Sequence, residues 1–135
     1  MRSCAVLSLA VLLLIGCGGA GETAPLKELQ RVHSGDLDVV LLSAGDSLKQ
    51  GKGAFVLEFH GAGGALVDVG TVTVGASMPM AGMAPMFGDC MVTPTATKGR
   101  YDVSSDLGMA GTWRLNIMWN GPRGQGSASL PASAS

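Results

Sequence analysis

Methionine is the residue whose number and spacing first suggest a chemistry in this chain of 135 residues. Five of the eight methionines fall between Met78 and Met91, within the segment SMPMAGMAPMFGDCM. A thioether sulfur is a soft, neutral ligand that suits Cu(I) and binds Zn²⁺ or Mg²⁺ poorly. Pro79, Gly82 and Pro85 interrupt the segment, disfavour regular pairing and predict a shaped loop. Such a loop could bring two or three sulfur atoms around one ion.

The same segment has interpretations without a metal. Methionine fills irregular space in cores and forms adaptable binding surfaces, so the loop could cap one end of the fold or contact a hydrophobic partner. Cys90 is either a soft ligand or a small buried apolar residue, and His60 is either a nitrogen ligand or a surface histidine. These alternatives stay open on the residues alone.

Motifs typical of enzymes are absent from the sequence. It contains no Gly-x-Ser-x-Gly, Cys-x-x-Cys or His-Glu-x-x-His pattern and no phosphate loop. Two histidines are too few for a three-ligand zinc site unless carboxylates join them. A nucleophilic pair of Cys90 and His60 is one remaining arrangement, but no neighbouring residue marks Cys90 as a thiol of lowered pKa. We therefore expect a protein that is not an enzyme.

Composition narrows the function classes further. The chain is 47% hydrophobic and 14% charged, with a formal net charge of −1. Without a basic excess, nucleic-acid binding is disfavoured, and the apolar fraction argues against a disordered chain. The length fits one domain and not two.

The N-terminal residues 1–16 have the pattern of a secretory signal. Arg2 precedes an apolar run from Ala5 to Ile15 that only Ser8 interrupts. As a helix this run would span about 16 Å, half of the ~30 Å hydrocarbon thickness of a bilayer, so a transmembrane helix is the weaker interpretation.

The end of this run, Leu14-Ile15-Gly16-Cys17, resembles the lipobox of bacterial lipoproteins. The resemblance implies that residues 1–16 are removed and that Cys17 receives fatty acyl chains such as palmitate, which anchor the protein to a membrane. The alternative is an ordinary cleavage site with Cys17 merely nearby. Because Gly18 and not Asp follows, the resemblance implies the periplasmic face of the outer membrane in a two-membrane bacterium. A lipidated Cys17 would leave Cys90 without a disulfide partner, so the core must hold the fold.

The remaining chain divides by composition. Residues 17–34 are expected to form the lipidated cysteine with a flexible tether and an irregular arm, residues 35–130 the folded domain, and residues 131–135 a disordered tail. Within the domain, apolar residues alternate with polar ones and turn signals recur, which predicts short strands at 37–43, 53–60, 66–69, 71–74, 89–95, 100–104, 113–119 and 125–130. The fold class is therefore all-β, an immunoglobulin-like antiparallel β-sandwich of about seven strands, with a closed barrel as the alternative.

Several sequence stretches, taken in order, resemble the YtkA-like domain family over roughly residues 35 to 130. They are Gly53 to Leu57, Val67 to Val74, Met78-Pro79-Met80-x-x-Met83, Gly99-Arg100-Tyr101 and Leu107 to Trp113. The resemblance implies a small immunoglobulin-like module outside the cytoplasm and a connection with copper handling.

The resemblance also implies site residues. Met78, Met80 and Met83 match the methionine turn of the family, and Met109 and Trp113 match its second motif. The tryptophan could shield a Cu(I) ion or simply pack the core. Two further candidates, Met86 and Cys90, are additions without a match in the family.

Together these observations predict a lipid-anchored envelope protein that binds Cu(I), or else Ag(I), through Met78, Met80 and Met83, with Met86 or Met109 completing the set of ligands. The expected partner is a metal transporter or an oxidase-assembly protein. The alternative is a non-metal module that docks on a membrane complex of the envelope.

Overall fold

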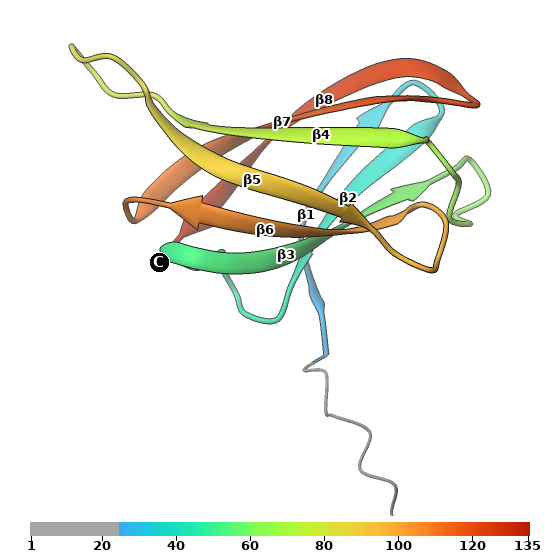
Figure 1. Cartoon of the computed structure of the whole chain (residues 1–135), viewed down its shortest axis with the longest axis horizontal. Coiled ribbons are helices and arrows are strands. Elements are labelled where there is room, and N and C mark those ends of the chain that lie inside the picture. Colours follow the sequence, from blue (N-terminus) through green and yellow to red (C-terminus); the bar gives the residue numbers. More distant parts are fainter. Residues whose placement is uncertain (1–24) are drawn as a thin grey trace, which may run out of the picture.

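The structure, a computed structural model, describes residues 25–135. Its eight strands are β1 (Lys27–Ser34), β2 (Leu37–Ser43), β3 (Gly51–His60), β4 (Thr71–Met78), β5 (Met86–Pro94), β6 (Arg100–Leu107), β7 (Gly111–Gly121) and β8 (Gly124–Ala134). All neighbouring strands are antiparallel, in the order β1-β2-β3-β6-β5-β4-β7-β8 (Figure 1). The expected signal peptide and Cys17 lie outside the described residues. Between residues 25 and 135 there is no helix that could span a membrane.

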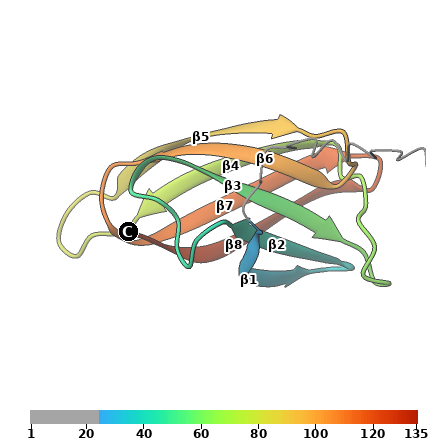
Figure 2. The same cartoon turned by 90° about the horizontal axis from the view of Figure 1, so that it is seen from below.

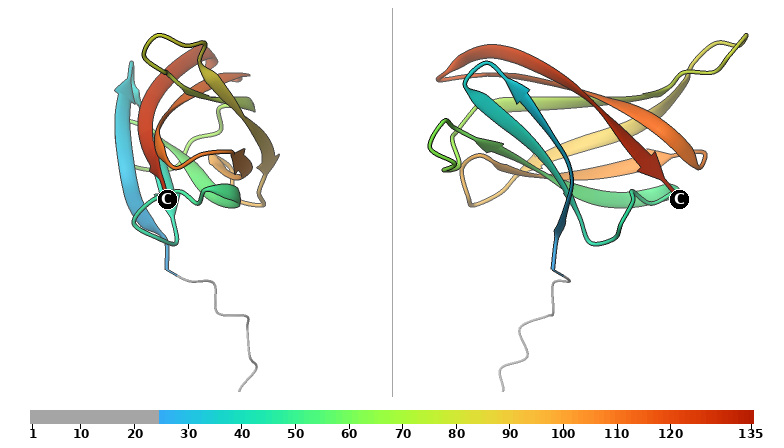
Figure 3. Two further views of the ribbon diagram at one scale, coloured as in Figure 1. Left: turned by 90° about the vertical axis from the view of Figure 1, so that its left-hand side faces the viewer. Right: turned by 180° about the vertical axis from the view of Figure 1, so that it is seen from behind.

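The sheet curls until its first and last strands lie beside each other. Figure 3 shows β1 next to β8 when the molecule is viewed from its end. The Ser34 hydroxyl donates a hydrogen bond to the carbonyl oxygen of Ser127, at 3.1 Å. The Leu48 N–H donates to the carbonyl oxygen of Ser133, at 2.8 Å. The all-β class is thus confirmed, as eight strands in one nearly closed sheet.

Alternation along each strand determines which side chains enter the core. In β7, Trp113, Leu115, Ile117 and Trp119 are buried, while the residues between them are exposed. Phe59 packs edge-on against two further aromatic rings, with centroid separations of 5.6 Å to Tyr101 and 5.3 Å to Trp119. The strands around this core run between two ends of the molecule, and Figures 1 and 2 show the β4–β5 hairpin and the C-terminus at the same end.

Both ends of the described chain differ from the sequence-based expectation. Residues 27–34, expected within the tether and arm, form strand β1. A β-bulge between Glu28 and Gln30 shifts the register, which explains why Leu29 and Val32 both reach the core at a spacing of three. Residues 131–134, expected in a disordered tail, belong to β8 and pair with β7. Pro131 is tolerated there because β8 is an edge strand.

One expected strand is not regular. Residues 66–69 form only an isolated bridge between Leu66 and His60 before β4 begins at Thr71. Next to this segment, the backbone at Gly70 lies directly against the backbone at Gly121. A Cβ atom on Gly70 would meet the carbonyl oxygen of Asn120 at 2.4 Å. Residues 66–69 are thus held by this backbone contact and not by regular strand pairing, at the end of the molecule opposite the β4–β5 hairpin.

Candidate functional site

The methionine-rich segment forms the hairpin between β4 and β5, which we call the methionine hairpin (residues 78–86). Met78, the last residue of β4, is the register partner of Met86, the first residue of β5. At the tip, the Met83 N–H donates a hydrogen bond to the Met80 carbonyl oxygen at 3.4 Å, and Gly82 adopts a φ of 71°. A positive φ at this place in a turn favours glycine. The interrupted segment thus forms a shaped turn between two paired methionines.

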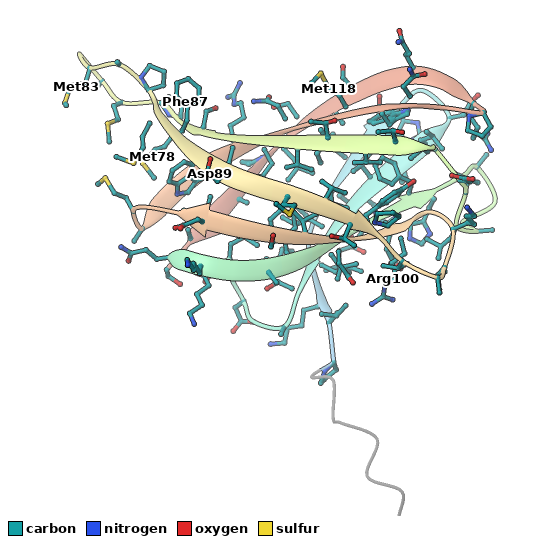
Figure 4. All side chains as sticks on the ribbon, in the orientation of Figure 1. Met78, Met83, Phe87, Asp89, Arg100 and Met118 are labelled. Atoms are coloured by element: carbon teal, nitrogen blue, oxygen red, sulfur yellow. The ribbon has the colours of Figure 1, made fainter. Side chains whose placement is uncertain are left out.

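The methionines of the hairpin differ in their exposure to solvent. Met78 is 8% exposed, and Met80 and Met86 are half-buried against the core. Met83 is 71% exposed. Figure 4 shows Met83 at the far tip of the hairpin and Met78 near its base. The structure therefore brings Met78 and Met86 together at the base and leaves Met83 in solvent.

The connection between β6 and β7, which carries Met109, lies against this base. A side chain on Gly111 would meet the Met78 Cε atom at 2.9 Å, and one on Gly108 would lie 3.8 Å from the Met86 Sδ atom. Each of the two paired methionines thus packs against one end of the Met109 connection. The two glycines were not predicted as site residues, although they flank Met109 in the sequence Gly108-Met109-Ala110-Gly111.

Trp113 lies beneath this connection in the core. Its side chain is fully buried, and its Nε1–H donates a hydrogen bond of 3.0 Å to the backbone carbonyl oxygen of Met109. The ring also limits space at Gly88, where a Cβ atom would meet Trp113 Cζ3 at 3.3 Å. Trp113 therefore contributes to the candidate site by fixing the backbone of Met109.

His60 lies away from the methionines. The first residue of β3, Gly51, pairs with Leu107 beside the Met109 connection, and His60 is the last residue of the same strand. His60 is therefore one full strand length away from that connection. The His60 Nδ1 atom is 2.8 Å from the carbonyl oxygen of Gly64, and Nε2 is 3.4 Å from Glu58. Within residues 25–135, no group of three or more His, Cys, Asp or Glu side chains is arranged to hold a metal ion.

Cys90 points to the same face of β5 as Met86 but lies four residues farther along the strand, about 13 Å away at the rise of a β-strand. It is a free, half-buried cysteine, and burial raises the pKa of its thiol to about 11, with a further contribution from the Asp89 charge. This position separates Cys90 from the paired methionines.

The raised pKa predicts slow alkylation of Cys90 in the folded protein. The thiolate is the reactive form, and an increase from 9.0 to about 11 lowers its population about 100-fold at pH 8. We expect the iodoacetamide reaction rate at Cys90 to keep rising up to pH 11. Urea should restore the rate of an ordinary thiol. Equal rates in folded and unfolded protein at pH 8 would contradict this assignment and would favour a reactive cysteine.

Comparison with known proteins identifies the family of this fold. A family model described as YtkA-like matches residues 31–118. The match begins within β1, ends within β7, and includes the methionine hairpin and Met109. No curated protein and no solved structure matches the chain. The match covers more than half of the sequence, and the chain belongs to the YtkA-like family.

Proposed function

We propose that this protein is a lipid-anchored domain of the bacterial cell envelope that binds Cu(I), or Ag(I), at the base of the methionine hairpin. One observation carries the proposal: Met78 and Met86 are register partners, and both pack against the connection that bears Met109. Side chains of directly opposite residues lie on the same face of a sheet, with Cβ atoms about 5 Å apart. Three segments that carry methionines therefore meet at one end of the molecule, where Met109 is 41% exposed.

The chemistry of these groups favours a soft monovalent ion. Thioether sulfur is neutral, does not compete for protons near neutral pH and does not form disulfides, so it can serve as a ligand outside the cytoplasm. Partial burial of Met80 and Met86 restricts water around the sulfur atoms. In this proposal Met78, Met86 and Met109 are the ligands, the half-buried Met80 is an additional one, and the exposed Met83 receives or delivers the ion.

The proposal is tested by anaerobic Cu(I) titration of the purified protein against a chromogenic chelator of known affinity. We expect the combined variant Met78→Leu, Met80→Leu, Met86→Leu, Met109→Leu to lose affinity by more than about 100-fold, because even outer partners of metal ligands change affinity by about 10- to 100-fold. Leucine preserves the apolar volume, so each exchange should cost less than about 1.5 kcal/mol of stability.

The matched control replaces Met91 and Met118 with leucine. Both are exposed methionines outside the hairpin and the Met109 connection, at 69% and 56% exposure. The control variant should bind Cu(I) as the unmodified protein does. If the four-site variant competes with the chelator as well as the control does, copper binding at the hairpin is excluded.

The proposed membrane anchor, location and partner are supported by sequence motifs and by the family resemblance. Anchoring depends on Cys17 in the lipobox-like segment, and the proposed location is the periplasmic face of the outer membrane. The proposed recipient of the ion is a membrane transporter or an oxidase-assembly protein. A second candidate function, docking on an envelope membrane complex without a metal, is supported by the exposed apolar side chains of Phe87 and Met91 on β5.

A further inference from the structure

Strand β5 has a free edge over most of its length. It pairs with β4 only through Met86, Phe87 and Gly88, and from Asp89 to Pro94 its register partners all lie on β6. The facing part of β4, Thr71 to Gly75, pairs with β7. Figure 1 shows β4 and β5 diverging from the hairpin. Along residues 89–94, one side of the β5 backbone is therefore available for hydrogen bonds to another strand.

The outer face of this strand is unusually apolar for an edge. Phe87 is 75% exposed and Met91 is 69% exposed, with Asp89 between them. Edge strands are normally protected against pairing by several charged residues or by a central proline. Strand β1, at one end of the strand order, follows this rule with Lys27, Glu28, Arg31 and His33. Strand β5 has one charge in its middle, and its Pro94 is the last residue.

The charge on this face is mainly negative. Asp89 is the register partner of Asp106, and Thr93 is the register partner of Asp102. Like charges directly opposite each other destabilise a sheet. Among the described residues no ion pair involves these three aspartates, although Lys52 is the register partner of Asp106 on β3. The outer face around β5 thus combines exposed apolar side chains with an excess of negative charge, three aspartates to one lysine.

We propose that the free edge and outer face of β5 dock an extended, positively charged segment of a partner protein, which adds a strand beside residues 89–94. Main-chain hydrogen bonds along the edge would supply affinity, and alternate side chains would supply specificity. A lysine or arginine of the partner would lie beside Asp89, and an apolar side chain would lie beside Met91.

Charge distinguishes this partner from two other occupants. A second copy of the chain would bring an equally acidic face against Asp89 and Asp106. A bilayer surface with anionic lipids would repel the same carboxylates. An extended basic peptide complements both the apolar side chains and the charge.

The docking surface is independent of the proposed copper site. Phe87 follows Met86 directly, so a docked segment would lie next to the methionine hairpin. None of the proposed contacts involves a metal ion, and docking can be measured on the metal-free protein. Loss of Cu(I) binding and loss of docking are therefore separable results.

The test uses the purified, metal-free protein and a fluorescent peptide with blocked ends and the repeat Lys-Thr-Val-Thr, which places lysine and valine in turn on one face of an extended strand. We expect saturable binding by anisotropy that weakens with added salt. Asp89→Lys should raise the Kd about tenfold or more, because juxtaposed like charges are strongly unfavourable. Met91→Thr should also raise the Kd, while the matched control Met118→Thr, on the outer face of β7, should leave it unchanged.

Two altered peptides distinguish strand addition from general attraction. The same peptide with alternate backbone nitrogens methylated should bind much more weakly, and the same peptide with glutamate in place of lysine should not bind. Equal binding of the lysine and glutamate peptides, or an unchanged Kd for Asp89→Lys, would overturn the proposal. Two other results would also overturn it. One is self-association of the protein in ultracentrifugation that Phe87→Thr abolishes. The other is binding to phosphatidylglycerol vesicles that requires Phe87, in a protein that does not bind the peptide.

Discussion

Replacing Trp113 with alanine should lower the free energy of unfolding by about 3–5 kcal/mol, the usual cost of removing a fully buried tryptophan. The ring is fully buried and lies under Gly88 and the Met109 connection, so neighbouring backbone would have to move to fill the space. Urea denaturation measures the loss, with the slope against denaturant checking that the unfolding transition remains the same.

A second substitution separates packing from hydrogen bonding. Trp113→Phe retains a buried ring but removes the Nε1–H donor to the Met109 carbonyl oxygen, a loss worth about 1 kcal/mol beyond the change in volume. It should also weaken Cu(I) binding if Trp113 holds Met109 in place for that purpose. Should Trp113→Ala prove no more destabilising than Met118→Ala at an exposed position, the placement of Trp113 in the core would be wrong.

Gly121→Ala should be strongly destabilising, although Gly121 does not have a positive φ. A Cβ atom at Gly121 would meet the Val69 carbonyl oxygen at 2.4 Å and the Gly70 Cα atom at 2.6 Å. Both obstacles are backbone atoms, which cannot rotate away, so the two crossing segments must separate. Overpacking of this kind costs about 3 kcal/mol, which corresponds to a decrease in Tm of about 10 °C.

The matched control is Gly75→Ala. Gly75 lies on the exposed face of β4, and a Cβ atom there would meet nothing within 4 Å. Alanine also reduces the freedom of the unfolded chain, so we expect no loss of stability or a gain of about 0.5 kcal/mol. Scanning calorimetry of both variants tests the backbone crossing, which would be refuted by equal melting temperatures.

Regular alternation made most strands predictable. The residues from Trp113 to Trp119 predict a strand at 113–119, and β7 extends this by two residues at each end. Strand β1 was not predictable in the same way because its bulge gives Leu29 and Val32 a spacing that resembles a helical turn. The β8 pairing of residues 131–134 was also missed, since its inward residues are small and its outward ones include Pro131.

The sequence predicts which segment carries the candidate site, but it does not predict how the methionine side chains are arranged in space. Proline and glycine positions identify the loop, yet they do not reveal that Met78 and Met86 become register partners while Met83 projects into solvent. The approach of Met109 depends on strand order, because β7 pairs with β4 and β6 with β5. Strand direction likewise separates His60 from the methionines, which residue types alone could not show.

The closure of the sheet has a consequence for how the protein is made. Strand β1 contacts β8 through Ser34 and Ser127, which are 93 positions apart, and Leu48 bonds to Ser133 and Ser135. Such distant pairings form late, because the loop entropy of the whole intervening chain must first be overcome. A ribosome therefore has to complete residues 133–135 before the sheet can close. Late closure of the sheet suits passage of an unfolded chain through a translocation pore, as the proposed location in the cell envelope requires.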